Sequence, residues 1–307
     1  MKACVFVGPT LRPGDLGATA DLAVLPPVAQ GDVYRVGQSR PRAIGIIDGY
    51  FEGVLSVWHK EILWAMAEGI HVFGSASMGA LRAVELHAFG MQGIGRIFEA
   101  YRAGELEDDD EVAVIHGPAE TGYLALSEAM VNIRGTLAEA ERAGVIRARS
   151  REALVRIAKD LFYHDRTFEH LLDRAAGSLV DPEEIAALRA WLPTGRIDQK
   201  REDALAMLAA MQALLASDPE PLRVDYAFEW TEVWDSATAA SAVSPGTAAG
   251  GPRAWLPDDR VLEELRLEAD TYLAVRDQAL LRFLAAREAG RRRQTVDPTA
   301  AREIFAG

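Results

Sequence analysis

Cysteine is nearly absent from this sequence, which has 307 residues and a single cysteine, Cys4. One thiol excludes a disulfide framework and a thiolate-rich metal site. Cys4 lies within a short apolar run, so we expect a small buried side chain in a reducing compartment. Long apolar runs are lacking as well, and no segment reaches the roughly 20 residues that span a membrane. We therefore expect a cytoplasmic protein that does not bind membranes.

Basic residues are few relative to acidic ones, with 33 lysines and arginines against 46 aspartates and glutamates. The formal net charge of -13 argues against nucleic acid as the main partner, because phosphate binding needs basic patches. Lysine itself is scarce, and the chain contains only Lys2, Lys60, Lys159 and Lys200. This scarcity directs attention to Lys60 and Lys200 as candidate functional residues.

Short apolar runs that end in glycine or serine turns occupy the first part of the chain. Residues 3–7, 44–47 and 70–73 are predicted to be buried strands, and residues 57–68 have the apolar spacing of one helical face. Strand, helix and strand in this order predict a βαβ unit with parallel strands. Residues 111–116 alternate and then run apolar, which predicts a further strand.

From about residue 125 onward, the apolar residues recur with the period of an α-helix. We expect an α/β fold with a small, mostly parallel sheet and flanking helices in the N-terminal part, followed by a helical C-terminal part. The expected divisions are an α/β core at 1–125, helices packed on it at 126–235, a linker rich in Ala, Ser, Gly and Pro at 236–257, and a C-terminal helix at 258–307.

The turn Ser75-Ala76-Ser77-Met78-Gly79 resembles the G-x-S-x-G nucleophile elbow, with serine in place of the first glycine. Small residues permit the tight strand-to-helix turn that such an elbow requires. Ser77 is therefore a candidate nucleophile, the amides of Met78 and Gly79 are candidate oxyanion donors, and Ser75 is the competing hydroxyl. The alternative is an ordinary helix N-cap, for which serine is common.

A nucleophilic serine needs a base, and two neighbouring side chains compete for that role. His59 and Lys60 follow one another on a helix and point roughly 100° apart, so only one of them faces Ser77. His59 would form a Ser-His-Asp set with Asp48, whereas Lys60 would form a Ser-Lys pair. A lysine base must be neutral, which requires burial to lower its pKa from about 10.4. The spacing leaves both bases open.

Three motifs in the same region resemble the TfuA family. They are residues 47–51 (IDGYF), residues 57–63 (VWHKEIL) and residues 74–85 (GSASMGALRAVE). The resemblance continues to residues 109–113 and, more weakly, to residues 159–163 and 198–203, so that it covers about the first two thirds of the chain.

The resemblance implies a role beside YcaO enzymes, which install thioamides in the backbone of a precursor peptide. TfuA proteins are understood to hydrolyse the C-terminal thiocarboxylate of a ThiS-type sulfur-carrier protein and so to supply sulfide. A Ser-Lys pair is the family's proposed machinery. Ser77 and Lys60 are the matching positions here. From the residues themselves, we expect Asp48 and Arg82 to support the site, with the Arg82 charge offsetting that of the anionic substrate. We expect neither a metal nor a cofactor.

Lys159 and Lys200 also lie in family-like segments, so the choice of functional lysine stays open among Lys60, Lys159 and Lys200. Two other functions are compatible with the sequence. A non-catalytic adaptor would dock on YcaO and improve its hold on the precursor peptide, with Ser77 only capping a helix. A general esterase-like hydrolase would use the same serine on a small substrate. The leading expectation is thiocarboxylate hydrolysis combined with docking on YcaO.

Overall fold

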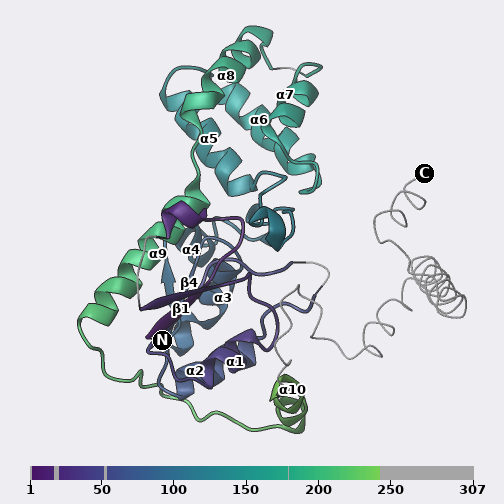
Figure 1. The fold of residues 1–307 in the computed structure, drawn as a ribbon. Helices are drawn as coiled ribbons and strands as arrows, with labels where there is room; N and C mark the ends of the chain where they lie inside the picture. The colour runs from purple at the N-terminus through teal and green to yellow at the C-terminus, as the bar shows by residue number, and fades with distance from the viewer. Residues whose placement is uncertain (1, 17–20, 52–53, 179, 243–307) are drawn as a thin grey trace, which may run out of the picture. The chain divides into compact units, whose positions relative to one another are not determined.

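A five-stranded sheet forms the centre of the N-terminal part in the computed structural model, which describes residues 2–16, 21–51, 54–178 and 180–242 (Figure 1). The strands are β1 (Ala3–Phe6), β2 (Leu22–Leu25), β3 (Ala43–Ile46), β4 (His71–Ser75) and β5 (Gln92–Ile94). All neighbouring strands are parallel, in the order β2-β1-β3-β4-β5. This sheet confirms the expected α/β fold.

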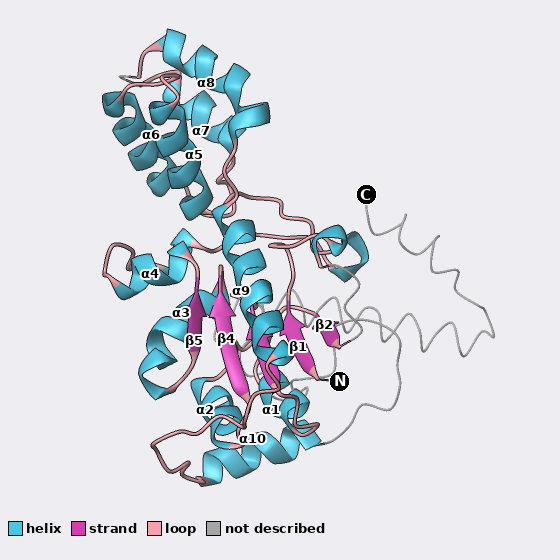
Figure 2. Cartoon of the chain, turned by 90° about the vertical axis from the view of Figure 1, so that its left-hand side faces the viewer, coloured by secondary structure: helices cyan, strands magenta, loops and turns pink. Residues whose placement is uncertain are grey.

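Helices surround the sheet and continue as a group of their own. The described helices are α1 (Asp32–Gly37), α2 (His59–Ala67), α3 (Met78–Leu86), α4 (Arg96–Arg102), α5 (Met130–Arg142), α6 (Ala148–Asp160), α7 (Phe168–Ala175), α8 (Pro182–Gly195), α9 (Gln199–Ala216) and α10 (Glu232–Ala242). Figure 2 shows α5 to α8 gathered beyond the sheet, while α9 returns along it. The expected helical part is thus confirmed. Within the described ranges, none of the helices combines the length and the apolar character needed to cross a bilayer.

Alternating side chains of the central strands bury both faces of the sheet. Phe6 and Ile44 belong to the core cluster shared with α1, α2 and α3, whereas Val5 and Ala43, each one position earlier, belong to the cluster shared with α9. A further cluster holds α5 to α8 together. Helices α9 and α3 accordingly lie on opposite faces of the strands (Figure 1).

The order of the strands reverses between β1 and β3, since β2 lies on the outer side of β1 while β4 and β5 continue from β3. In open α/β sheets such a reversal leaves a crevice at the carboxyl ends of the two strands, and ligands bind there. The residues that follow these strands are 8–10 after β1 and Asp48 after β3. The turn after β4 carries Ser77 at the same edge of the sheet.

The expected strand at residues 111–116 is wrong. A short 3-10 turn at Asp109–Glu111 is followed by chain without regular structure up to an isolated bridge at His116. Two interactions fix this path instead of a ladder: Glu111 pairs with Arg134, and the carbonyl of Val112 accepts a hydrogen bond from Lys200. The position beside β4 is taken by β5, a three-residue strand too short to give a periodic signal.

The expected linker begins within a helix, because residues 236–242 belong to α10. Helix α10 is anchored by Trp234, which is buried against Tyr34 and Trp64. The rest of the expected linker and the expected C-terminal helix at 258–307 lie outside the described residues.

Gly79 lets α3 begin directly against β3. A Cβ atom at this position would lie 1.8 Å from the carbonyl oxygen of Ile46. We expect Gly79→Ala to lower the free energy of unfolding by about 3 kcal/mol, because the obstructing atom is backbone and cannot rotate away. Urea unfolding followed by circular dichroism measures the change. Gly177→Ala is the matched control, since a Cβ there meets nothing within 4 Å. Equal losses in the two variants would contradict the close-approach argument.

Candidate active site

Four polar side chains meet at the carboxyl edge of the sheet. They are Thr10, Asp48, Ser77 and Lys200, and all four are buried. Lys200 Nζ lies 3.2 Å from Ser77 Oγ and 4.0 Å from Asp48 Oδ1, and the Thr10 hydroxyl donates to that same Oδ1 at 2.6 Å. Buried polar groups are costly unless they are paired, and here each one finds a partner within the group. The result is a hydroxyl, an amine and a carboxylate in one connected set.

Ser77 lies in a sharp turn between β4 and α3. The Ser77 amide donates to the Ser75 carbonyl at 2.7 Å, and Ala76 between them has φ of 64°, a conformation that a residue with a Cβ rarely adopts. Ser77 occupies the N-cap position of α3, yet its side chain makes no capping hydrogen bond. The hydroxyl instead accepts from Lys200 Nζ. The ordinary N-cap interpretation therefore does not account for this side chain.

Lys200 enters the site from the first turn of α9, where it is only 3% exposed. Its Nζ donates to Ser77 Oγ and, at 2.8 Å, to the carbonyl oxygen of Val112. Burial lowers the pKa of Lys200, while the carboxylates of Asp48, Asp198 and Glu128 act against that shift. The positive end of the α9 dipole also disfavours the ammonium form. These influences move the amine toward the neutral state that a base requires.

Asp48 is held by backbone and hydroxyl donors that follow β1. Its Oδ2 accepts from the amides of Gly8 at 2.8 Å and Thr10 at 3.1 Å, and its Oδ1 accepts from the Thr10 hydroxyl. Three donors therefore satisfy the oxygens of a carboxylate that is only 1% exposed. Asp48 and Ser77 thus lie at the same edge of the sheet, each within 4.0 Å of Lys200 Nζ.

The first two amides of α3 differ in their hydrogen bonding. The Gly79 amide donates to the carbonyl of Ile47 at 3.2 Å, so it is already engaged. The Met78 amide has no acceptor among the described residues. It points from the positive end of a nine-residue helix, where a developing negative charge is favoured. Of the two amides expected as oxyanion donors, that of Met78 is thus the one without an acceptor in the described part of the chain.

The expected pairing of Ser77 with Lys60 is absent. Lys60 Nζ donates to the hydroxyl of Thr231 at 3.1 Å and lies 5.4 Å from the centre of the Phe228 ring. Lys60 belongs to the first turn of α2, and its side chain follows the segment that leads into α10. Lys200 takes the position beside Ser77 that the sequence assigned to Lys60.

The alternative base, His59, is engaged elsewhere too. Its Nε2 lies 2.8 Å from Glu85, and Arg82 pairs with the same carboxylate at 2.7 Å. Arg82 also donates to the carbonyl of Val57, so its charge serves the α2–α3 surface rather than Ser77. Ser75, the competing hydroxyl, donates to the carbonyl of Ile94 at 2.8 Å and links β4 to β5.

Lys159 belongs to a separate network of ion pairs. Its Nζ pairs with Asp108, Asp110 and Glu111, and the buried Arg166 donates to Asp110 at 2.8 Å. This network attaches the acidic turn after α4 to the end of α6. Of the three lysines left open by the sequence, only Lys200 contacts Ser77.

Thr10 is the member of the site that the sequence patterns missed. In the sequence, Thr10 is marked only by its position shortly after β1. That this position lies next to Asp48 follows from the strand order, in which β1 and β3 are neighbours. In the described part of the chain, no three His, Cys, Asp or Glu side chains are grouped so as to hold a metal ion.

Residues 48–167 match the model of a family described as TfuA-like protein. Over this stretch the chain is similar to the TfuA-like family. The match includes Asp48 and Ser77 but neither Thr10 nor Lys200. No curated protein matches the chain. This similarity supports a role in the YcaO-associated thioamidation system, because the family is associated with YcaO enzymes.

Proposed function

We propose that this protein hydrolyses the C-terminal thiocarboxylate of a ThiS-type sulfur-carrier protein, and that the sulfide serves a YcaO enzyme in thioamidation of a precursor peptide. The observation that supports the proposal most directly is the contact of Lys200 Nζ with Ser77 Oγ at 3.2 Å. A hydroxyl beside an amine of lowered pKa is a nucleophile beside its base. The pair that we propose is Ser77 with Lys200.

In the first half of the reaction, Ser77 Oγ attacks the thiocarboxylate carbon and its proton passes to Lys200 Nζ. The C–S bond breaks, the lysine returns the proton to the departing sulfur, and hydrosulfide leaves. The substrate is anionic, so its added charge needs positive surroundings. The free Met78 amide at the start of α3 supplies a donor for the developing oxyanion.

In the second half, water attacks the ester formed between the carrier and Ser77. Lys200 removes a proton from the water and then protonates Ser77 Oγ as the ester bond breaks. The carrier leaves with an ordinary C-terminal carboxylate. The balance requires only water and no metal or redox partner. Because Ser77 is 2% exposed, a carrier tail reaches it only after a local movement of the covering chain.

The direct test is to incubate the protein with a thiocarboxylated carrier and to measure sulfide with a thiol-trapping fluorophore. We expect sulfide and carrier carboxylate to appear in equal amounts, the latter measured by mass spectrometry. The same carrier ending in a carboxylate is the control. Sulfide release at the rate of the protein-free blank would contradict hydrolysis.

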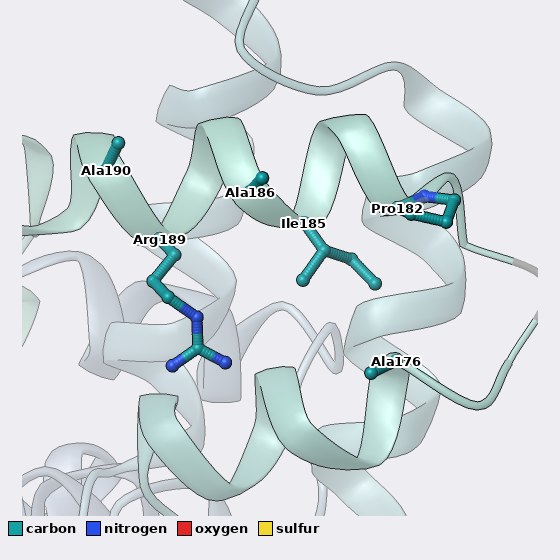
Figure 3. Close-up of a pocket in the computed structure, with 6 residues that line it drawn as sticks. All are labelled: Ala176, Pro182, Ile185, Ala186, Arg189 and Ala190. Carbon is teal, nitrogen blue, oxygen red and sulfur yellow. The ribbon is translucent and has the colours of Figure 1, made fainter.

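A second candidate function is docking on YcaO as an adaptor, which a hollow between α7 and α8 favours (Figure 3). The hollow has a volume of about 440 Å³ and is lined by Ala176, Pro182, Ile185, Ala186, Arg189 and Ala190. Figure 3 shows Ile185 and Arg189 directed from α8 into the space toward α7. This mostly apolar surface contains none of the four site residues, so the chemistry at Ser77 does not explain it.

Free sulfide separates the two functions in a reaction that contains YcaO, ATP and precursor peptide. A pure sulfide supplier becomes dispensable when sulfide is added, whereas an adaptor is still required. In a separate test, Ala186→Glu is expected to weaken YcaO binding in a pull-down if the hollow between α7 and α8 is the docking site. Ala187→Glu is the matched control, because Ala187 is exposed on the same helix outside the lining. Equal binding by both variants would exclude the hollow.

A further inference from the structure

The carboxylate of Asp48 and the amine of Lys200 stop just short of a hydrogen bond. Their nearest atoms, Oδ1 and Nζ, are 4.0 Å apart, although both groups are almost fully buried. A charge-assisted hydrogen bond between such groups normally closes to about 2.8 Å and is stronger than a bond to a neutral oxygen. Lys200 instead gives its hydrogen bonds to the neutral oxygens of Ser77 and Val112. Another interaction must therefore hold the Asp48 carboxylate away from Lys200.

The residues after β1 provide the restraint. The amides of Gly8 and Thr10 hold Oδ2 and do not contact Oδ1. The Thr10 hydroxyl donates at 2.6 Å to Oδ1, the same oxygen that faces Lys200. This bond occupies one lone pair of Oδ1 and reduces the negative charge that the oxygen presents to the amine.

We propose that Thr10 is a positioning residue whose hydroxyl holds the Asp48 carboxylate out of hydrogen-bond reach of Lys200, so that the amine is directed at Ser77. Only the catalytic consequence, an amine directed at Ser77 as its base, rests on the proposed function. The arrangement of Thr10, Asp48 and Lys200 itself can be tested in the absence of substrate. Thr10 lies outside the residues that match the family model.

Loss of the Thr10 hydroxyl and loss of the Asp48 charge are expected to shift the pKa of Lys200 in opposite directions. The charged groups that act on Lys200 are the carboxylates of Asp48, Asp198 and Glu128. Without the Thr10 hydroxyl, Oδ1 is free to accept directly from Lys200, which stabilises the ammonium and raises its pKa. Without the Asp48 charge, the ammonium loses its nearest counter-ion and the pKa falls.

The chain offers a direct measurement, because it contains only four lysines. The protein is labelled with [13Cε]-lysine, and the Lys200 signal is identified by its loss in Lys200→Met. We expect Thr10→Val to raise the Lys200 titration midpoint by about one pH unit and Asp48→Asn to lower it by about one unit or more. Thr10→Ser keeps the hydroxyl and is expected to restore the parent midpoint. In sulfide-release assays, the acid limb of the pH profile shifts in the same directions.

Opposite shifts support the proposal, and a merely structural role of Thr10 would not produce them. A Thr10→Val midpoint that is unchanged or lower overturns the proposal. If Asp48→Asn does not fold, the pair Thr10→Val and Thr10→Ser decides the question alone. A parent protein that releases no sulfide overturns the proposed function but leaves the titration test intact, so the two failures are distinguishable.

Discussion

Replacing Ser77 by alanine is expected to reduce sulfide release from a thiocarboxylated carrier by about 10³-fold or more. The reason is that the hydroxyl forms the covalent bond in the proposed reaction, and no neighbouring group is placed to substitute for it. Ser77 makes no capping hydrogen bond, so its loss is not expected to weaken α3. The measurement is initial sulfide release at saturating carrier, with urea unfolding as a check of the fold.

Ser75→Ala is the matched control for Ser77→Ala. Both serines are buried in the same turn, but the Ser75 hydroxyl donates to the carbonyl of Ile94 and does not contact Lys200. Ser75→Ala is expected to retain activity and to lose about 1 kcal/mol of unfolding free energy for the broken hydrogen bond. A folded Ser77→Ala variant that releases sulfide at the parent rate would remove Ser77 from the mechanism. Labelling of Ser77 by a fluorophosphonate would support a nucleophilic hydroxyl and would extend the substrate range toward esters.

Replacing Lys200 by methionine is expected to reduce sulfide release by about 10²- to 10⁴-fold, the range typical of a lost acid-base group. Methionine has nearly the shape of the lysine stem but cannot take the proton of Ser77. Asp48 keeps its three hydrogen-bond donors in this variant but loses the nearby amine, so urea unfolding is measured alongside activity to confirm that the variant is folded. In the parent, the rate is expected to rise with pH through the lowered pKa of Lys200, since only the neutral amine is a base.

Lys60→Met tests whether Lys60 or Lys200 is the base for Ser77. Lys60 lies on Thr231 and Phe228, away from Ser77, so activity close to that of the parent is expected. The comparison is made at one pH on both variants with the same carrier. Loss of activity in Lys60→Met together with retention in Lys200→Met would restore the pairing suggested by the sequence motif and refute the one argued from the geometry.

Local patterns were sufficient for the elements that carry the site. Apolar runs at residues 3–7, 44–47 and 70–73 predicted the strands, because a strand buried on both faces needs apolar residues throughout. The small residues around Ser77 predicted a tight turn into a helix, and the turn is present between β4 and α3. These features depend on neighbours within a few residues, which is the range that a sequence pattern encodes. The three-residue strand β5 is too short for such a pattern.

Only the tertiary structure decided which side chain stands beside Ser77. Lys200 is 123 positions away along the chain and arrives on a helix that follows the whole α5–α8 group. The sequence placed Lys60 nearer because α2 precedes β4, but α2 begins with its first turn against residues 228–231. Thr10 and Asp48, 38 positions apart, likewise meet only because β1 and β3 are neighbours in the sheet. The sequence alone therefore determined the α/β fold and the turn that presents Ser77. The pairing with Lys200 depended on the packing of α9, since contacts between distant segments are set by the shapes of whole elements rather than by local periodicity.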